Sequence, residues 1–221
     1  MRSSLSFTVA SILLLGCLLA SLRIAAQPSP EPAIHEPVAP VHAAVPSHDG
    51  KAQLGEKLFN DVRLSGGKRT ACSSCHLLAQ GGDHGRLRTR GADGHLLPFN
   101  VPTVFNASLS FRLNWRGNFR TLEEQAEAVL LDPRLMNTSW RQLIAELRGT
   151  SSYAAAFARI YGREPRRADV LDAIARFERT LVTPNARFDR YLRGEEDAIT
   201  RDERRGYELF QSHGCTACHQ G

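Results

Sequence analysis

Cys72-Ser73-Ser74-Cys75-His76 and Cys215-Thr216-Ala217-Cys218-His219 are the two stretches that decide the class of fold. In each, two residues separate the cysteines, a spacing that suits thioether bonds from both thiols to the vinyl groups of one haem. The histidine that follows at once places an imidazole beneath the iron. The pattern therefore predicts two covalently attached haem c groups, with His76 and His219 as the proximal iron ligands.

The cysteine count favours haem over the other sites that cysteine pairs form. Of five cysteines, four lie in these two motifs and the fifth, Cys17, lies in an N-terminal apolar segment. Four cysteines in an exported chain can form disulfides, and a single Cys-x-x-Cys pair can be a redox dithiol or half of a zinc site. None of these requires histidine directly after both pairs, so haem is the preferred interpretation and zinc the alternative.

The N-terminal segment has the pattern of an export signal. Arg2 supplies a positive charge, residues 3–22 are uncharged and largely apolar, and the small pair Ala25-Ala26 follows. We predict a cleaved signal peptide over residues 1–26, while the apolar run is also long enough for an uncleaved membrane tether. Both interpretations place the remaining chain in the periplasm. Residues 27–49 hold six of the eleven prolines and are expected to form a linker.

Charge and composition restrict the kinds of partner. The chain carries 28 Lys and Arg against 23 Asp and Glu, a formal net charge of +5. This excess fits an acidic partner protein or an anionic membrane surface, and it fits better still a solvated basic surface. The sequence has no lysine–arginine block interleaved with aromatic residues, so nucleic-acid binding is not expected.

A shared Gly-x-x-Leu-Phe pattern precedes both cysteine motifs. It reads Gly55-Glu56-Lys57-Leu58-Phe59 before the first and Gly206-Tyr207-Glu208-Leu209-Phe210 before the second. Each stretch is typical of a short helix with an apolar pair facing a haem. The repeat predicts two cytochrome c-like haem domains, the first over residues 50–198 and the second, incomplete, over residues 199–221.

Helical periodicity dominates between the motifs, and the predicted fold class is all-α. Thr121 with Glu124 three residues later forms a capping box for a helix that Pro133 ends. One later helix has an apolar face made by residues at helical spacing, namely Val170, Ile174, Phe177 and Leu181. The helices are expected at residues 122–131, 139–148, 151–161, 167–182 and 185–193. Residues 80–106 are rich in glycine and are expected to form a structured loop.

Further stretches, in the same order along the chain, match a known family together with the cysteine motifs. They are Leu58-Phe59, Arg63-Leu64-Ser65, Pro102-Thr103-Val104-Phe105-Asn106, Asn114-Trp115-Arg116-Gly117, Leu122-Glu123-Glu124-Gln125-Ala126, Phe177-Glu178-Arg179-Thr180-Leu181 and Arg187-Phe188-Asp189-Arg190-Tyr191-Leu192. Through them, residues 50–221 resemble the bacterial dihaem cytochrome c peroxidases, a family that includes the methylamine dehydrogenase maturation enzyme. The resemblance implies a haem on His76 that reacts with hydrogen peroxide. It implies a second haem, on His219, that receives electrons from a small redox protein, a cytochrome c or a cupredoxin.

The resemblance also implies roles for three residues between the motifs. Trp115 matches a tryptophan between the two haems, Gln125 matches a glutamine near the peroxide pocket, and Asn100 matches an asparagine that holds a calcium ion between the domains. Each has a simpler interpretation, as a core aromatic, a solvent-facing helix residue and a turn residue respectively. A homodimer is a further expectation.

Three departures from the family pattern bear on the chemistry. Leu135 stands where the family has an acidic residue that assists O–O cleavage, and leucine cannot carry a proton. Ala92 stands where many members have a removable distal histidine, so the first haem is expected to be five-coordinate unless His95 or His84 binds its iron. A solvated loop histidine is the commoner case. The sequence ends at Gly221, where the family continues with the pocket of the second haem, so the second domain is expected to be incomplete.

The function predicted from these features is that of an oxidoreductase that reduces hydrogen peroxide with electrons from a small redox protein. One alternative is a dihaem electron-transfer protein without peroxide chemistry, which Leu135 favours unless Asp132 or a nearby histidine supplies the proton. A second alternative is a haem enzyme that oxidises a partner protein.

Overall fold

The structure, a computed structural model, describes residues 37–41 and 46–219. Its longer helices are α2 (Gly50–Phe59), α3 (Leu122–Leu131), α4 (Trp140–Gly149), α5 (Ser151–Tyr161), α6 (Arg167–Glu178), α7 (Arg187–Leu192) and α8 (Arg201–Ser212). Short 3-10 turns include η3 (Cys72–Ser74) and η7 (Cys215–Ala217). Within the described residues, pairing of extended segments is limited to isolated bridges. The predicted all-α class is confirmed.

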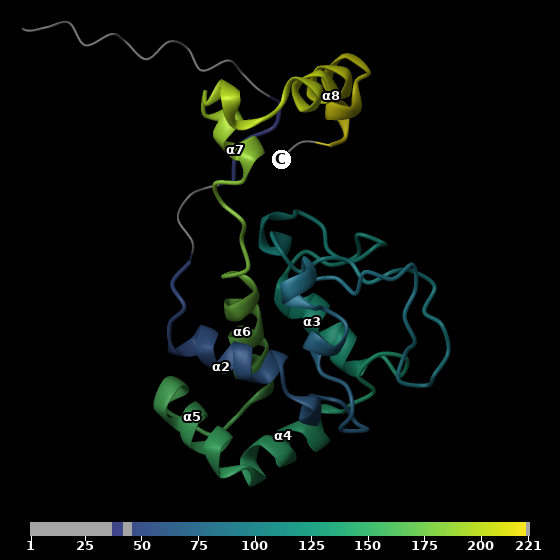
Figure 1. The fold of residues 1–221 in the computed structure, drawn as a ribbon. Helices are drawn as coiled ribbons and strands as arrows, with labels where there is room; N and C mark the ends of the chain where they lie inside the picture. Colours follow the sequence, from purple (N-terminus) through teal and green to yellow (C-terminus); the bar gives the residue numbers. More distant parts are fainter. Residues whose placement is uncertain (1–36, 42–45, 220–221) are drawn as a thin grey trace, which may run out of the picture.

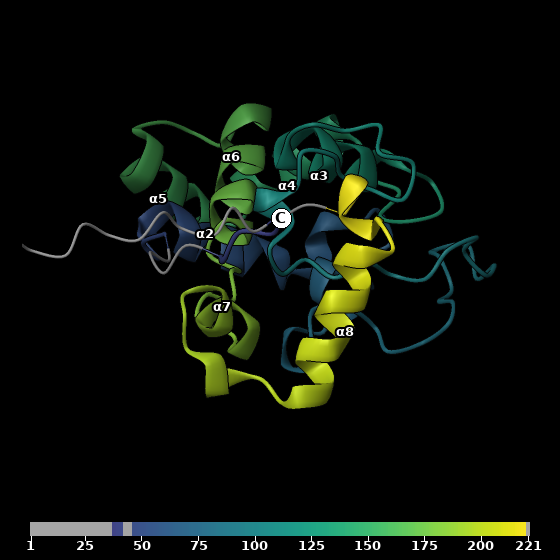
Figure 2. The ribbon, with the colours of Figure 1, turned by 90° about the horizontal axis from the view of Figure 1, so that it is seen from above.

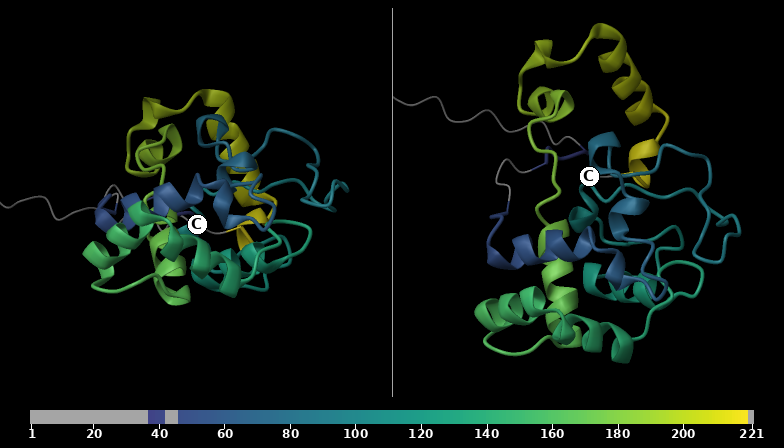
Figure 3. Two further views of the ribbon diagram at one scale, coloured as in Figure 1. Left: turned by 90° about the horizontal axis from the view of Figure 1, so that it is seen from below. Right: turned by 60° about the horizontal axis from the view of Figure 1, so that its bottom comes forward.

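Helices α2 to α6 form the larger of two bodies. Helices α2 and α6 cross at the centre of this body, and α3 lies beside α6 (Figures 1 and 3). Helices α4 and α5 pack together at one end of the body. Its main apolar core contains side chains from all five helices, among them Leu54, Leu58, Leu130, Leu147, Phe157 and Ile174. Burial of this apolar surface is the main force that holds the five short helices together.

The crossing of α2 and α6 depends on Gly55. A Cβ atom at this position would lie 1.9 Å from the carbonyl oxygen of Ala173 and 2.8 Å from Cβ of Phe177, so only glycine allows the two helices to approach so closely. The first glycine of the Gly-x-x-Leu-Phe pattern therefore sets how α6 meets α2. The Leu58 and Phe59 side chains that follow are fully buried.

Three predicted helices agree with the structure to within one residue. The capping box of α3 is confirmed, because Thr121 accepts from the backbone N–H of Glu124 while the Glu124 carboxylate accepts from that of Thr121. Helix α5 has the predicted bounds. Helix α4 begins one residue later than predicted, since Ser139 is its N-cap and accepts from the N–H of Gln142.

Two predicted helices are shorter in the structure. The helix predicted over 167–182 ends at Glu178, because the chain tightens into a turn in which the Thr180 hydroxyl donates to the carbonyl three residues earlier. The helix predicted over 185–193 begins only at Arg187. Asn185 has a φ of 63°, a left-handed conformation that a right-handed helix cannot include.

Helices α7 and α8 form the smaller body, which lies to one side of the five-helix body and is joined to it by the segment after α6 (Figure 1). In the view from above, α7 and α8 lie in front of the larger body (Figure 2). An aromatic cluster of Phe188, Tyr191 and Tyr207 connects α7 to α8. A piece of the predicted linker also packs here, since the N–H of Val41 donates to the buried carboxylate of Asp189. This contact could not be expected from the proline-rich composition.

The predicted signal peptide or tether at residues 1–26 lies outside the described residues, as does part of the linker. In the part of the chain that the structure does describe, none of the helices has both the length and the apolar character that crossing a membrane requires.

Candidate functional site

The first cysteine motif closes into one tight turn. The N–H groups of Cys75 and His76 both donate to the carbonyl of Cys72, at 3.1 and 2.9 Å. The turn holds both cysteines and the histidine within one short stretch of backbone. Cys72 packs against an apolar cluster that includes Phe59 on α2 and Phe177 on α6. An apolar wall beside a Cys-x-x-Cys-His turn suits the flat apolar surface of a porphyrin.

The second motif repeats this turn in its backbone. The N–H groups of Cys218 and His219 donate to the carbonyl of Cys215, at 3.2 and 2.9 Å. Cys218 has φ −118° and ψ −27°, close to the −114° and −29° of Cys75 in the first motif. Two stretches far apart in the sequence therefore build the same local geometry.

The phenylalanine of each Gly-x-x-Leu-Phe pattern stands in the same relation to its motif histidine. The ring centroids of Phe59 and His76 are 6.3 Å apart, and those of Phe210 and His219 are also 6.3 Å apart. The two interplanar angles are 44° and 53°. The repeat predicted from sequence is thus confirmed as a repeat of helix, turn and ring placement.

The two motifs differ in how well they are enclosed. Phe59 is 0% exposed, whereas Cys215, Cys218 and His219 lie at the surface. Beside His219 is an open hollow of about 520 Å³. It is lined by Val38, Phe188, Glu203, Gly206, Tyr207, Phe210 and His219.

His76 is held in the state that a metal ligand needs. Its Nδ1 lies 3.1 Å from the carbonyl oxygen of Gly82 and, when protonated, donates to it, which leaves Nε2 to bind a metal. Burial lowers the pKa of the His76 imidazole, and backbone carbonyls of Gly82 and Pro102 only partly oppose the effect. The imidazole is therefore neutral at pH 7, the form that ligates metals.

The thiols do not resemble a reactive dithiol or a zinc site. Burial raises the pKa of the Cys72 thiol to about 12 and also raises that of Cys75, so both are uncharged thiols at neutral pH. Redox-active cysteines require a lowered pKa. Among residues 37–41 and 46–219, no cluster of three or more His, Cys, Asp or Glu side chains is arranged to hold a metal ion, whereas a structural zinc site needs four ligands.

The segments that carry Ala92 and Leu135, two of the three predicted departures from the family pattern, are brought together. The N–H of Ala92 donates to the carbonyl of Arg134 at 2.7 Å, and Gly91 packs so closely on that carbonyl that a Cβ would lie 2.2 Å from it. The loop that carries Ala92 is therefore fastened to the turn that carries Leu135. The turn that carries Leu135 also folds back on α3, because the N–H of Met136 donates to the carbonyl of Val129 on that helix.

Of the three side chains predicted to replace the missing acid or ligand, Asp132 is engaged elsewhere and His95 is exposed, whereas His84 is neither. Asp132 accepts from the backbone and guanidinium of Arg134, which holds the pKa of that carboxyl below its usual range, so it is ionised and has no proton to give. His95 is 87% exposed and pairs with Asp93 at 3.5 Å. His84 is half-buried, and its Nδ1 is enclosed without a hydrogen-bond partner.

Trp115 and Asn100 contact each other. The indole Nε1 of Trp115 donates to the carbonyl of Asn100 at 2.9 Å, and the ring lies 6.2 Å from that of Phe99. Trp115 is 56% exposed, so it is not a core aromatic in the described structure. Gln125 is half-buried, one turn before Val129 on α3. The structure thus joins Trp115 to Asn100.

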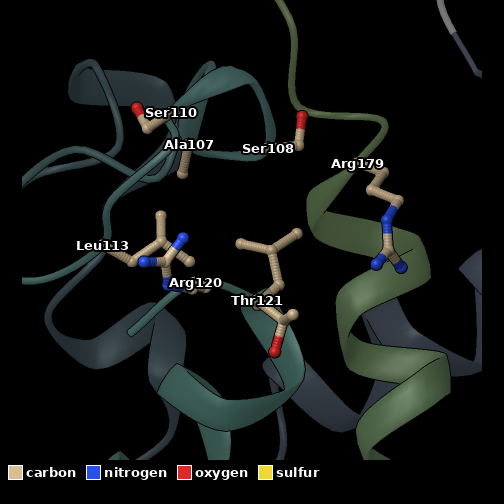
Figure 4. Close-up of a pocket in the computed structure, with 8 residues that line it drawn as sticks. Ala107, Ser108, Ser110, Leu113, Arg120, Thr121 and Arg179 are labelled. Atoms are coloured by element: carbon tan, nitrogen blue, oxygen red, sulfur yellow. The ribbon is translucent and has the colours of Figure 1, made fainter. Parts of the chain in front are cut away.

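A small pocket lies where the start of α3 meets the end of α6 (Figure 4). Its volume is about 120 Å³. It is lined by Ala107, Ser108, Ser110, Leu113, Arg120, Thr121, Leu122 and Arg179. Hydroxyl and guanidinium groups are suited to binding a small anion, but Arg179 is already paired with Glu123 at 2.8 Å.

One buried carboxyl was given no role by sequence. Glu178, at the end of α6, is only 7% exposed, and its Oε2 has no hydrogen-bond partner. Burial and, to a smaller extent, the nearby charge of Glu123 together raise the pKa of this carboxyl to about 8, although Arg179 opposes the rise. The signal was present in the sequence, because Glu178 lies four residues after Ile174 on the apolar face of the helix.

Comparisons with known proteins place these features in a family. A family model described as di-haem cytochrome c peroxidase matches residues 49–197. The chain is 38% identical over 188 residues to the cytochrome c peroxidase Ccp of Escherichia coli, covering 85% of this chain and 40% of that protein. It is 38% identical over 172 residues to the methylamine utilization protein MauG of Methylorubrum extorquens, covering 76% of this chain and 49% of that protein.

A solved structure gives the same answer for the fold. A MauG-like protein associated with microbial copper homeostasis matches with a TM-score of 0.67 at 30% sequence identity, covering 82% of this chain and 54% of that one. The chain thus spans about half the length of the proteins that it matches.

Proposed function

Because the chain belongs to the di-haem cytochrome c peroxidase family, we propose that each of its Cys-x-x-Cys-His turns carries a covalently attached haem and that the protein reduces hydrogen peroxide with electrons from a small redox protein. Membership of the family implies haem cofactors. What we propose in addition is that Cys72, Cys75, Cys215 and Cys218 attach them covalently.

The observation that carries the proposal is the repeated turn. Two Cys-x-x-Cys-His segments share hydrogen bonds, backbone angles and the 6.3 Å spacing between phenylalanine and histidine rings. The residues at the first turn fit a haem, since uncharged thiols, a neutral imidazole and an apolar wall lie together. When bound, haem supplies an iron centre that exchanges single electrons and binds peroxide.

The chain's own residues hold and orient this centre. His76 offers Nε2 to the metal while Gly82 fixes its ring, and Phe59 and Phe177 exclude water from one side of the turn. The family resemblance supports a division of labour, with peroxide reacting at the His76 site and electrons entering at the His219 site.

Further roles are part of the same proposal. Trp115 relays electrons between the two sites, Gln125 lines the peroxide pocket, and Asn100 contributes an oxygen to a calcium site. The hydrogen bond from Trp115 to Asn100 supports a link between the relay and the calcium position, because a ligand at Asn100 would fix the loop that orients the indole. Export to the periplasm, a membrane tether and a homodimer remain predictions from the sequence.

One observation favours a second candidate, a dihaem electron-transfer protein. Leu135 cannot carry a proton and Asp132 is held ionised by Arg134, so neither supplies the acid catalysis that peroxide cleavage uses. The third candidate, oxidation of a partner protein, is supported by the likeness to MauG.

Peroxide turnover by the haem-loaded protein distinguishes these candidates. We expect oxidation of a reduced cytochrome c that depends on added peroxide and that is lost in His76→Ala, while His95→Gln, a change at an exposed loop histidine, leaves it intact. Haem-loaded protein that leaves the Soret band unchanged on addition of peroxide, and shows no turnover, would instead be an electron-transfer protein. Turnover of a partner protein without oxidation of the cytochrome would favour the third candidate.

A further inference from the structure

Glu178 is a buried acid without a structural partner. Its carboxyl belongs to the last turn of α6, where Phe177 and Leu181 on either side both pack in the apolar cluster that contains Cys72. The Oε2 atom is enclosed and makes no hydrogen bond. An unpaired carboxylate in such surroundings is expensive, whereas a neutral carboxylic acid is tolerated much better.

The charges around Glu178 leave its ionisation sensitive to any new charge nearby. In the described structure, the charged groups that act on it are Glu123 on α3 and Arg179, the C-cap residue of α6. The Arg179 guanidinium is 2.8 Å from the Glu123 carboxylate, so the Glu123 charge largely neutralises the positive charge of Arg179. The pKa of about 8 lies close to working pH, where small changes of potential alter protonation.

Glu178 is also placed beside the first haem anchor. It is close enough to Cys72 for its charge to raise the pKa of that thiol. A haem attached through Cys72 would bring its iron into the same poorly solvated interior as the Glu178 carboxyl. Charges that share such an interior interact strongly, so a change of one unit of charge on that iron would alter the ionisation of Glu178.

We propose that Glu178 is the proton-accepting group coupled to reduction of the first haem. Its carboxylate takes up one proton from solvent as one electron from the donor protein reduces the iron from the ferric to the ferrous state, and it releases that proton when the iron is oxidised again. The net charge of the buried site is then the same in both states. This inference rests on the haem attachment in the proposed function, but it does not require peroxide turnover.

The test is the midpoint potential of the first haem as a function of pH. Cys215→Ser with Cys218→Ser leaves only the first attachment site, and both cysteines lie at the surface of the smaller body. In this background we expect the potential to fall as pH rises through the region around 8, by up to about 59 mV per pH unit, the tenfold equivalent for a one-electron couple. With Glu178→Gln the slope in that range is lost. Glu56→Gln, an exposed glutamate on α2, retains it.

An infrared difference spectrum between reduced and oxidised protein gives a second readout that does not depend on the variant's folding. We expect a carbonyl band of a protonated carboxylic acid to appear on reduction near pH 8. A potential with the same pH slope in Glu178→Gln as in the parent, or a difference spectrum without that band, would overturn the proposal. Absence of a haem spectrum would instead refute the haem attachment, and a normal pH slope without turnover would refute only peroxidase activity.

Discussion

At the level of single residues, the proposed chemistry of the first site turns on Leu135 and Ala92, which are predicted to replace the family's acid and its removable histidine. The hydrogen bond from Ala92 to Arg134 brings the segments that carry these two residues together. A peroxide bound there would lack a side chain that shifts a proton between its oxygens.

Leu135→Glu is therefore expected to speed peroxide cleavage. A positioned general acid contributes typically about 10²–10⁴-fold, so we expect a gain of roughly tenfold or more in the rate at which peroxide changes the Soret spectrum, measured by stopped flow. Leu131→Glu, which adds the same acid at an exposed position on α3, should leave the rate unchanged. An unaltered rate in Leu135→Glu would mean that proton transfer at this position does not limit the reaction.

Glu178 gives a prediction for stability as well as for redox potential. Burial, with the help of Glu123, raises its folded-state pKa from 4.5 to about 8, so the folded protein binds this proton more tightly than the unfolded chain does. The associated stability is fully present below about pH 4.5 and is lost as pH rises through about 8. Thermal unfolding of the haem-loaded protein should show a Tm that falls between these limits. Glu178→Gln should flatten that dependence, and an equally steep fall in the variant would show that another group causes it.

At the level of elements, the two Gly-x-x-Leu-Phe helices share a sequence pattern but not an environment. In α2, the glycine lies against the backbone of α6, whereas a Cβ at Gly206 of α8 would meet no atom within 4 Å. In the first unit, the glycine of the pattern is therefore needed for the packing of α2 against α6. In the second unit the same face borders the hollow beside His219.

Alanine at the two equivalent glycines is expected to have opposite effects on stability. Gly55→Ala would push α2 away from α6 and should lower the free energy of unfolding by roughly 1–3 kcal/mol or more, as overpacking of a core does. Gly206→Ala should stabilise α8 by about 0.5–1 kcal/mol, because alanine restricts the unfolded chain more than glycine does. Denaturant unfolding of both variants, alongside the parent, measures this. Equal effects at the two sites would contradict the crossing geometry.

The sequence predicted those elements whose signals are local. The Thr121–Glu124 capping box and the apolar spacing on α6 gave helix type and position, and the repeated pattern gave the two histidine turns. The predicted end of α6 was wrong, because the hydrogen bond from the Thr180 hydroxyl to a nearby carbonyl competes with the helix. The apolar periodicity of the sequence does not indicate such a bond. Helix α7 is shorter than predicted because Asn185 adopts a left-handed backbone conformation, which the periodicity does not indicate either.

Contacts between distant segments could not be predicted in this way. The bonds from Ala92 to Arg134 and from Val41 to Asp189 join residues whose neighbourhood only the folded chain defines. Glu178 had a readable position on an apolar helix face, but its lack of a partner depends on how α3 and η3 surround it. The local geometry of the two histidine turns was thus predictable from motifs, and the electrostatics around Glu178 were not.

At the level of the whole molecule, one histidine turn is enclosed by a five-helix body and the other lies at the surface of a smaller body. The enclosed turn has the apolar wall and neutral imidazole that suit chemistry protected from water. The proposed division between a peroxide site at His76 and an electron-entry site at His219 rests on the family to which the chain belongs.

The mass of the intact chain, produced in a host that attaches haem to cytochromes c, tests the central claim most directly. We expect the polypeptide mass increased by two haem groups. Cys72→Ser with Cys75→Ser should remove one of them, and Cys215→Ser with Cys218→Ser should remove the other. A chain that carries only its polypeptide mass, or that keeps both haems after either pair is replaced, would contradict the account.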